Sequence, residues 1–155
     1  MERCVTDSPL GRLLLMADDM GLCALTPTDE LPCAPGTPLL AACVRQLEEY
    51  FHGERTVFDL PLHPQGTSFR LLCWEALQAI PFGQTRTYAQ QAAAIGNAKA
   101  VRAVGGADHH NPIMIIIPCH RVIGADGSLT GYAGGLEMKD WLLAHERSVL
   151  AAGLG

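Results

Sequence analysis

The feature that most constrains folding is a change of pattern at HPQGT, residues 63–67. Before it, short apolar runs are separated by turn residues, which indicates strands. After it, apolar residues recur at helical spacing. A chain of 155 residues has room for one domain or two small ones. We therefore predict an α/β scaffold domain with a short sheet at residues 1–62 and a mainly helical domain at residues 66–155.

The first part contains two elements with clear boundaries. Residues 8–27 predict a hairpin, because two apolar stretches flank a polar turn. Residues 37–53 predict a helix that Thr37 caps at its start and Gly53 ends. Residues 57–62, VFDLPL, predict a further strand. The apolar face of the helix consists of Leu40, Cys43, Leu47 and Phe51.

The second part is predicted to be helical at residues 68–80, 87–96, 97–107 and 136–146. The two middle segments are short and are joined through a glycine turn, which indicates a helix-turn-helix. Residues 121–132 predict a small hairpin with an Asp-Gly turn. The buried side of the first helix is expected to hold Phe69, Leu72, Cys73, Ala76 and Ile80.

The charge distribution is uneven along the chain. The net charge is −5, which weakly disfavours a nucleic-acid partner. Residues 1–84 carry a balance of −6, whereas residues 85–121 hold four basic side chains and one acidic side chain. The start lacks a cationic stretch followed by an apolar segment, and the longest apolar run is too short to span a bilayer. We expect a cytoplasmic protein with no membrane partner.

The cysteines argue against a disulfide framework. The chain holds six, and reduced thiols are expected in a protein that is not exported. No two are spaced as C-x-x-C, so neither a zinc ribbon nor a thioredoxin-type motif is present. Cys43 and Cys73 stand at apolar positions and are typical of small core residues.

Cys119 stands in IPCHRVIGADG, where it ends an apolar run and precedes His120 and Arg121. These residues alone leave four interpretations of Cys119 open: a nucleophile, a metal ligand, one half of a disulfide or an inert core thiol. A nucleophilic cysteine acts as its thiolate, which a neighbouring cation or base stabilises. An inert buried thiol is the ordinary role of a lone cysteine. No protease signature surrounds it, although distant bases are available at His63, His109, His110 and His145.

The segment at residues 97–107 is nearly all alanine and glycine. Its larger side chains are Lys99, Val101, Arg102 and Val104. Small side chains let a backbone approach another surface closely, and Arg102 would project from that surface. Tight helix packing with one solvated arginine explains the same pattern equally well.

Residues 69–146 closely resemble the O6-alkylguanine-DNA alkyltransferase family. The resemblance rests on PCHRV at residues 118–122, preceded by TYAQQAA, RAVGGA and Asn111 and followed by GYAGG and KDWLLAHE. It covers about half of the chain, and the combination of motifs is highly specific. Residues 1–60 match loosely, through SPLG and LEEYFHG.

The resemblance implies a methylated-DNA–[protein]-cysteine S-methyltransferase that acts once. Members take an alkyl group from the O6 of guanine in double-stranded DNA onto a cysteine, without a cofactor and without regeneration. They bind the minor groove, flip the damaged base and are monomers. The helical domain is then expected to be a winged helix-turn-helix that holds both the DNA surface and the cysteine.

Carried over residue by residue, Cys119 is the alkyl acceptor. His120 would activate it through a bridging water, and Glu146 would orient and polarise His120. Asn111 would brace the turn that presents the cysteine. Tyr88 would donate a hydrogen bond to the flipped base or crowd the phosphate that rotates.

The DNA-binding set that the resemblance implies is Arg102, Tyr88, Lys99, Ala103 and Gly105. Arg102 would enter the base stack as the target nucleotide swings out, because flipping loses stacking and pairing. The small residues around it would fit a narrow groove. The implied substrate pocket consists of Val122, Tyr132, Ala133, Gly134 and Lys139. Arg121 in the family supports the motif rather than performing chemistry.

The sequence departs from the family at two points. Ala133 stands where some relatives have a serine whose hydroxyl helps to bind the guanine O6, which suggests a roomier pocket. Some relatives also bind a structural zinc in the first domain. Cys23 and His63 are possible ligands, but two ligands do not make a site, so we predict no metal.

Two other functions remain open on the sequence. A lesion-binding protein would keep the DNA surface without transferring the alkyl group, and it would apply if His120 and Glu146 failed to activate Cys119. A thiol enzyme or redox sensor would act on small molecules, but no resolving cysteine lies nearby in sequence. DNA binding separates the first two functions from the third, and covalent transfer separates alkyl repair from both.

Overall fold

The computed structural model describes residues 1–129, 131–132 and 134–153. The chain opens with an antiparallel sheet of three strands, β1 (Glu2–Thr6), β2 (Leu13–Ala17) and β3 (Leu22–Pro27). The predicted hairpin is confirmed as the β2–β3 pair. β1 was not predicted, because its first residues are exposed and only Cys4 and Val5 are buried.

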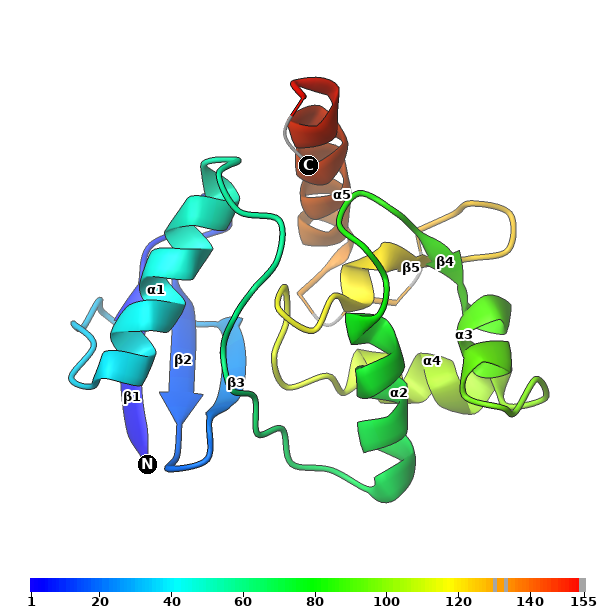
Figure 1. Ribbon diagram of the computed structural model, residues 1–155, viewed down its shortest axis with the longest axis horizontal. Helices are drawn as coiled ribbons and strands as arrows, with labels where there is room; N and C mark the ends of the chain where they lie inside the picture. Colours follow the sequence, from blue (N-terminus) through cyan, green and yellow to red (C-terminus); the bar gives the residue numbers. More distant parts are fainter. Residues whose placement is uncertain (130, 133, 154–155) are drawn as a thin grey trace.

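Helix α1 (Pro38–Phe51) packs against β1 and β2, as Figure 1 shows. Its predicted boundaries are confirmed. Thr37 Oγ1 accepts a hydrogen bond from the backbone N–H of Leu40 at 3.3 Å, which satisfies a donor that the first turn leaves free. Gly53 follows the helix with φ +74°, a conformation that glycine adopts without strain. Leu40, Cys43 and Leu47 are buried as expected.

The strand predicted at residues 57–62 is wrong. The segment is an irregular connection in which only Leu62 forms a bridge, parallel to Leu22. Pro61 follows Leu60 and lacks a backbone N–H, so a longer ladder cannot form there.

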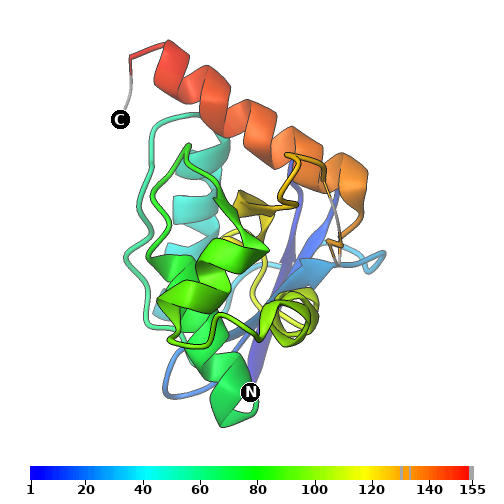
Figure 2. The ribbon, with the colours of Figure 1, turned by 90° about the vertical axis from the view of Figure 1, so that its right-hand side faces the viewer.

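The second part begins with α2 (Ser68–Gln78) and continues with β4 (Arg86–Thr87), α3 (Tyr88–Ala94) and α4 (Val101–His109). Gly96, with φ +79°, turns the chain between α3 and α4, and the two helices contact each other. The expected helix-turn-helix is therefore confirmed. Figure 2 looks almost down the axis of α4, which lies at the periphery of the molecule.

Two helix predictions need correction. The buried stripe of α2 is Cys73, Trp74 and Leu77, whereas Leu72 is exposed. The Trp74 indole explains the rotation, because its Nε1–H donates to the Ala107 carbonyl at 2.8 Å. α4 starts at Val101 rather than at residue 97, because residues 97–100 form a separate turn in which the Ala100 N–H donates to Asn97 O at 3.0 Å.

The hairpin predicted at residues 121–132 is also wrong. A 3₁₀ turn, η1 (Cys119–Arg121), leads into β5 (Val122–Ile123), which pairs in parallel with β4. The expected turn is present, since the Gly124 N–H donates to Ser128 O at 2.9 Å. None of the described residues after it forms a returning strand. Helix α5 (Leu136–Ala151) closes the fold and runs five residues past its expected end at 146.

The two parts share one hydrophobic core. The apolar run at residues 112–118 crosses to the sheet, where the Leu25 N–H donates to Pro112 O at 2.9 Å and the Met114 N–H donates to Leu25 O at 3.2 Å. A smaller cluster of Cys73, Ala92, Val104 and Ala107 lies between the helices of the second part. The segment that leads into Cys119 is therefore anchored on β3.

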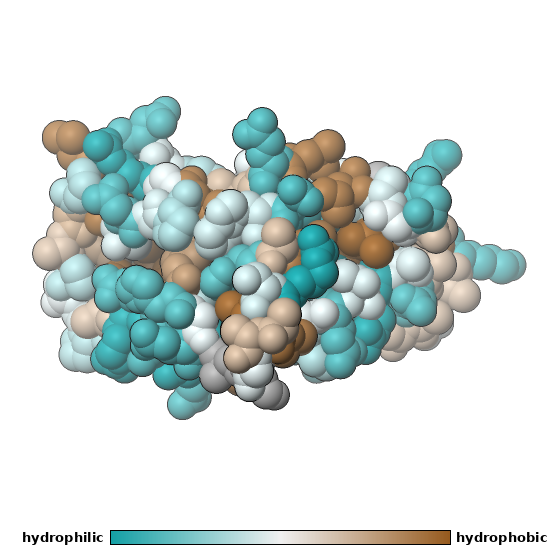
Figure 3. Space-filling view, turned by 90° about the horizontal axis from the view of Figure 1, so that it is seen from above, coloured by the Kyte–Doolittle hydropathy of each residue, from teal (hydrophilic) through white to brown (hydrophobic). Residues whose placement is uncertain are grey.

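The expected fold class is confirmed: a short sheet with α1, followed by a mainly helical part with a helix-turn-helix. Across the described ranges, no helix is long and apolar enough to cross a membrane. Hydrophilic side chains and small hydrophobic patches alternate on the face in Figure 3.

Candidate active site

Cys119 is the first residue of η1 and only 6% exposed. Its backbone N–H donates to Ile117 O at 2.8 Å. Burial raises the pKa of the Cys119 thiol to about 11. The resting group is therefore a protonated thiol, and it needs help to become a nucleophile.

Asn111 ties together the loop that presents Cys119. Its Nδ2 donates to Ile117 O at 2.8 Å and to Cys119 Sγ at 3.2 Å, and its Oδ1 accepts from the Ile113 N–H at 3.0 Å. Within this loop Ile115 has φ +72°, which is strained for a β-branched residue. The Asn111 bonds and the buried apolar contacts hold the strained loop in place.

Glu146 is 1% exposed and collects hydrogen bonds from four residues. Tyr50 Oη and His120 Nε2 each lie 2.7 Å from its Oε2. Arg121 makes a bidentate pair at 2.9 and 3.0 Å, and the Gly83 N–H donates at 2.9 Å. Burial acts to raise the pKa of Glu146, but His120 and Arg121 outweigh it and hold that pKa well below its usual range. Glu146 is an anion at neutral pH.

His120 is fully buried, and burial lowers its pKa despite the nearby Glu146 charge. An ionised Glu146 can only accept, so we assign the imidazole proton to Nε2. The opposite nitrogen, Nδ1, has no hydrogen-bond partner among the described residues. His120 is therefore a neutral imidazole with a basic nitrogen available.

Lys139 and Asp108 are two further buried ionisable residues near the thiol. Lys139 is fully buried, and its Nζ lies 5.9 Å from the centre of the Tyr88 ring. After the dominant effect of burial, Lys139 lowers the pKa of Cys119 and Asp108 raises it. Lys139 was expected in the substrate pocket, and its charge favours a thiolate.

Asp108 and its partner Gln91 were missed by sequence reasoning. Gln91 Nε2 donates to Asp108 Oδ1 at 2.8 Å, and burial raises the pKa of Asp108 to about 7. Asp108 Oδ2 and Gln91 Oε1 have no partner among the described residues. A proton on Asp108 would supply the donor that the two oxygens lack. The available signal was an acid one residue after Ala107, on the helix side that holds Val104.

The predicted DNA-binding residues gather around α4. A groove of about 650 Å³ brings Tyr88, Lys99, Arg102 and Gly105 together. Arg102 and Ala103 are exposed on α4, and Lys99 is exposed just before it. Tyr88 is half-buried and lies beside Gly105, where an added Cβ would meet its ring at 3.9 Å.

The predicted pocket residues lie next to the cysteine segment. Val122 is fully buried and Tyr132 is 6% exposed, with a hydroxyl that has no partner among the described residues. A Cβ on Gly134 would come within 2.6 Å of the Met138 sulfur and 2.9 Å of the Tyr132 ring, so a larger residue here would require these side chains to shift. Ala133 lies outside the described residues.

One group of side chains in the first part could approach a metal ion. Asp18, Cys23 and His63 each offer a ligand atom, and these atoms lie within 4.8 Å of one another. Asp18 was not named as a ligand from the sequence, because it lies in the β2–β3 turn and only the fold brings it to His63. Asp18 Oδ2 and His63 Nδ1 are already hydrogen-bonded at 2.7 Å. A structural zinc takes four ligands, one more than this group supplies, so the absence of a metal stays a prediction.

The fold thus combines a helix-turn-helix with a buried, hydrogen-bonded cysteine in the same part of the chain. Two family models match the chain. The ribonuclease-like domain of 6-O-methylguanine DNA methyltransferase matches residues 2–64, and the DNA binding domain of the same family matches residues 68–148. The chain therefore belongs to the 6-O-methylguanine DNA methyltransferase family.

Curated and solved relatives agree with this assignment. A methylated-DNA–protein-cysteine methyltransferase of Methanosarcina acetivorans is 47% identical over 96% of this chain and 99% of its own. One of Mycolicibacterium paratuberculosis is 48% identical over 95% of this chain and 93% of its own. The crystal structure of Mycobacterium tuberculosis OGT in complex with DNA is 44% identical, covers 96% and 94% of the two chains and has a TM-score of 0.89.

Proposed function

We propose that this protein repairs DNA by transferring alkyl groups from the O6 of guanine to its own Cys119, once per molecule. The observation that carries the proposal is the buried chain of contacts behind the surface helix. Asn111 binds the Cys119 sulfur at 3.2 Å, and Glu146 binds the adjacent His120 at 2.7 Å. Relatives that align over almost the whole chain carry the name methylated-DNA–protein-cysteine methyltransferase.

The chemistry follows from the charge states. His120 Nδ1 takes the thiol proton through a bridging water, and Glu146 stabilises the imidazolium that results. The thiolate attacks the alkyl carbon, so an S–C bond forms while the C–O bond to guanine breaks. The electron pair of that bond leaves with guanine, which then takes up a proton. The thioether has no route back to a thiol, so each molecule acts once.

The side chains around the thiol have defined roles in this proposal. Asn111 and Lys139 favour the thiolate, since a donated hydrogen bond and a positive charge both lower the pKa of Cys119. Val122, Tyr132 and Gly134 form the wall of the pocket that receives the base. Arg121 neutralises part of the Glu146 charge and fixes the carboxylate plane through its bidentate pair.

Double-stranded DNA carrying the lesion is the partner. Arg102 enters the base stack as the damaged nucleotide rotates out, and Tyr88 contacts the flipped base or its phosphate. Lys99 contacts the backbone, while Ala103 and Gly105 let α4 approach the minor groove closely. Binding is expected to weaken as salt rises, because phosphate contacts release counterions.

The proposal also assigns a role to each part of the chain and a cellular compartment to the protein. Residues 1–62 form a scaffold, and residues 66–155 bind DNA and accept the alkyl group. All six cysteines are free thiols, which suits the reducing cytoplasm. The protein acts as a monomer, and the transfer itself uses no cofactor.

The test is a mass measurement. The protein is incubated with a duplex that carries one O6-methylguanine, and its intact mass and peptide map are recorded. We expect a gain of one methylene unit on Cys119 alone. Cys119→Ser should bind the same duplex and gain nothing. Tight binding without a gain by the unsubstituted protein would favour a lesion-binding function, and neither binding nor gain would overturn the proposal.

A further inference from the structure

Tyr50 connects the first part of the chain to the Glu146 carboxylate. It lies on α1, is fully buried, and its hydroxyl donates to Glu146 Oε2 at 2.7 Å. The two residues are 96 positions apart in the sequence. His120 Nε2 binds the same oxygen at the same distance. Tyr50 and His120 therefore share one acceptor atom.

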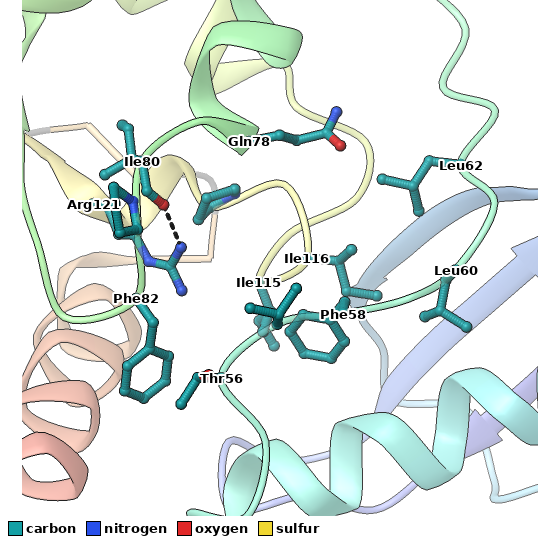
Figure 4. A pocket seen from close by; sticks show the side chains of 13 residues that line it. Thr56, Phe58, Leu60, Leu62, Gln78, Ile80, Phe82, Ile115, Ile116 and Arg121 are labelled. Carbon is teal, nitrogen blue, oxygen red and sulfur yellow. Dashed lines mark hydrogen bonds between the residues drawn. The ribbon is translucent and has the colours of Figure 1, made fainter. Parts of the chain in front are cut away.

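Aromatic side chains from both parts of the chain enclose this contact. The Tyr50 ring lies 5.5 Å from that of Phe58, in the connection after α1, and 5.9 Å from that of Phe82, in the turn after α2. The Arg121 guanidinium lies 5.7 Å from the centre of the Phe82 ring. Figure 4 shows Phe58, Phe82 and Arg121 around the cavity between the two parts.

The backbone of Tyr50 is fixed as well. His145 Nε2 lies 2.8 Å from the Tyr50 carbonyl oxygen, and the His145 ring stacks on Trp141 with centroids 4.9 Å apart. Ring contacts therefore hold the Tyr50 side chain, and the contact with His145 of α5 holds its backbone. Together they fix the position from which the hydroxyl binds Glu146. Burial and the Glu146 charge raise the pKa of Tyr50 well above its ordinary value, so the phenol remains a proton donor.

We infer that Tyr50 is a positioning residue for the alkyl transfer. Its hydroxyl shares Glu146 Oε2 with His120 and so weakens the hydrogen bond between Glu146 and the imidazole. The inference rests on the proposed function and extends it, because it gives the first part of the chain a direct role in the chemistry. Its physical basis is competition between two donors for one carboxylate oxygen.

Other groups that face Glu146 keep it in place when the hydroxyl is removed. Arg121 binds both carboxylate oxygens, and the Gly83 N–H binds Oε1. The charged and titratable groups around the pair are His120 and Arg121 from η1, Lys139 and His145 from α5, and Tyr132. Removing the Tyr50 hydroxyl therefore changes the strength of the Glu146–His120 contact more than its geometry.

The test compares Tyr50→Phe with the unsubstituted protein and with Phe58→Leu, which changes the same aromatic packing but touches no hydrogen bond to Glu146. The readout is the rate at which iodoacetamide alkylates Cys119, followed by peptide mass spectrometry across the range in which histidine titrates. Without the shared donor, Glu146 binds His120 more strongly and makes it more basic. The acid limb is the pH range in which the alkylation rate falls as His120 takes up a proton. For Tyr50→Phe it should move to higher pH by about half a unit or more, because hydrogen bonds to charged groups are stronger than those between neutral groups.

Phe58→Leu should lower thermal stability and leave the acid limb where it is. An acid limb for Tyr50→Phe that stays in place, or that moves with Phe58→Leu by the same amount, would overturn the inference. The proposed function is judged separately by transfer from the O6-methylguanine duplex. If that transfer fails in the unsubstituted protein, the proposed function fails, and the iodoacetamide profile still tests whether Tyr50 affects the reactivity of Cys119 through Glu146 and His120.

Discussion

Glu146 and Asp108 are both buried carboxyl groups, yet their surroundings shift their pKa values in opposite directions. Burial opposes ionisation of both. Glu146 receives donors from four residues, including the Arg121 cation, and its pKa falls well below the usual range. Asp108 receives one side-chain donor, from Gln91, and its pKa rises to about 7. The number and charge of the hydrogen-bond donors therefore decide whether the pKa of a buried carboxyl group falls or rises.

The difference separates two roles for a buried acid near Cys119. A permanently ionised Glu146 can stabilise a positive His120 during proton transfer. Asp108 changes charge close to neutral pH, and its negative form raises the pKa of the thiol. We therefore expect Cys119 to be most reactive when Glu146 is ionised and Asp108 is protonated.

Glu146→Gln should have the largest effect. The Arg121 guanidinium would stay buried without an anion, which costs about 3 kcal/mol, and alkyl transfer should fall by about 100-fold or more without the polarised base. Because the folded pKa of Glu146 is depressed, its stabilisation is present above the ordinary carboxyl pKa and is lost as the pH falls below it. Urea unfolding at two pH values and the transfer rate check this.

The matched control is Glu137→Gln, an exposed acid in the first turn of the same helix. It should change stability and transfer little. A Glu146→Gln protein that transfers at the unsubstituted rate would remove Glu146 from the mechanism.

Asp108→Asn should stabilise the protein above neutral pH. The unfolded carboxyl ionises near its ordinary pKa and the folded one near 7, so the unsubstituted protein loses stability as the pH rises between these values. The neutral variant avoids that loss, which amounts to about 4 kcal/mol by linkage. Thermal melts at pH values below and above this window measure it. Asp140→Asn, at an exposed position, should show no such pH dependence, and a gain that is equal at all pH values would contradict a titrating Asp108.

Gln91→Leu should destabilise the folded protein by a smaller amount. It removes the donor that lowers the pKa of Asp108 and leaves a buried carboxyl without a partner, at a cost of about 1–2 kcal/mol. Replacing both members, as Gln91→Leu with Asp108→Leu, should cost less than the single change. A double variant that is less stable than Gln91→Leu would show that the pair is not an isolated unit.

Arg102→Ala should have the smallest effect on stability and should leave the pKa values of Glu146 and Asp108 unchanged, since Arg102 is exposed on α4. Stability should change by less than about 0.5 kcal/mol, and transfer from free O6-benzylguanine should be unaltered. Transfer from a duplex should slow by about 10-fold or more, because flipping then lacks the residue that fills the stack. Arg147→Ala, an exposed arginine on α5, is the control. Equal slowing with both substrates would remove the flipping role.

The parts of the fold that sequence predicted best are those with local signals. Thr37 and Gly53 marked the ends of α1, and the glycine turn marked the helix-turn-helix. Cys119, His120, Asn111 and Glu146 were found through the family motifs rather than through spacing. The roles assigned to them remain predictions.

The parts that were missed depend on contacts between distant segments. The pairing of residues 112–114 with β3 and the Tyr50–Glu146 bond join the two halves of the chain, and no local pattern marks either. Residue 97 was predicted to begin a helix, but residues 97–100 form a separate turn. Leu72 looked buried, but the Trp74 hydrogen bond sets the rotation of α2. Asp108 was passed over because a single acid in a helix is ordinarily solvated.

The opposite pKa shifts of Glu146 and Asp108 are measured most directly by carbon-13 NMR of the side-chain carboxyl groups during a pH titration. Asp108 is expected to titrate with a midpoint near 7, while Glu146 stays ionised through the range in which ordinary carboxyl groups take up protons. An Asp108 midpoint in that ordinary acidic range, or a Glu146 that is protonated near neutral pH, would contradict the division of roles between the two acids.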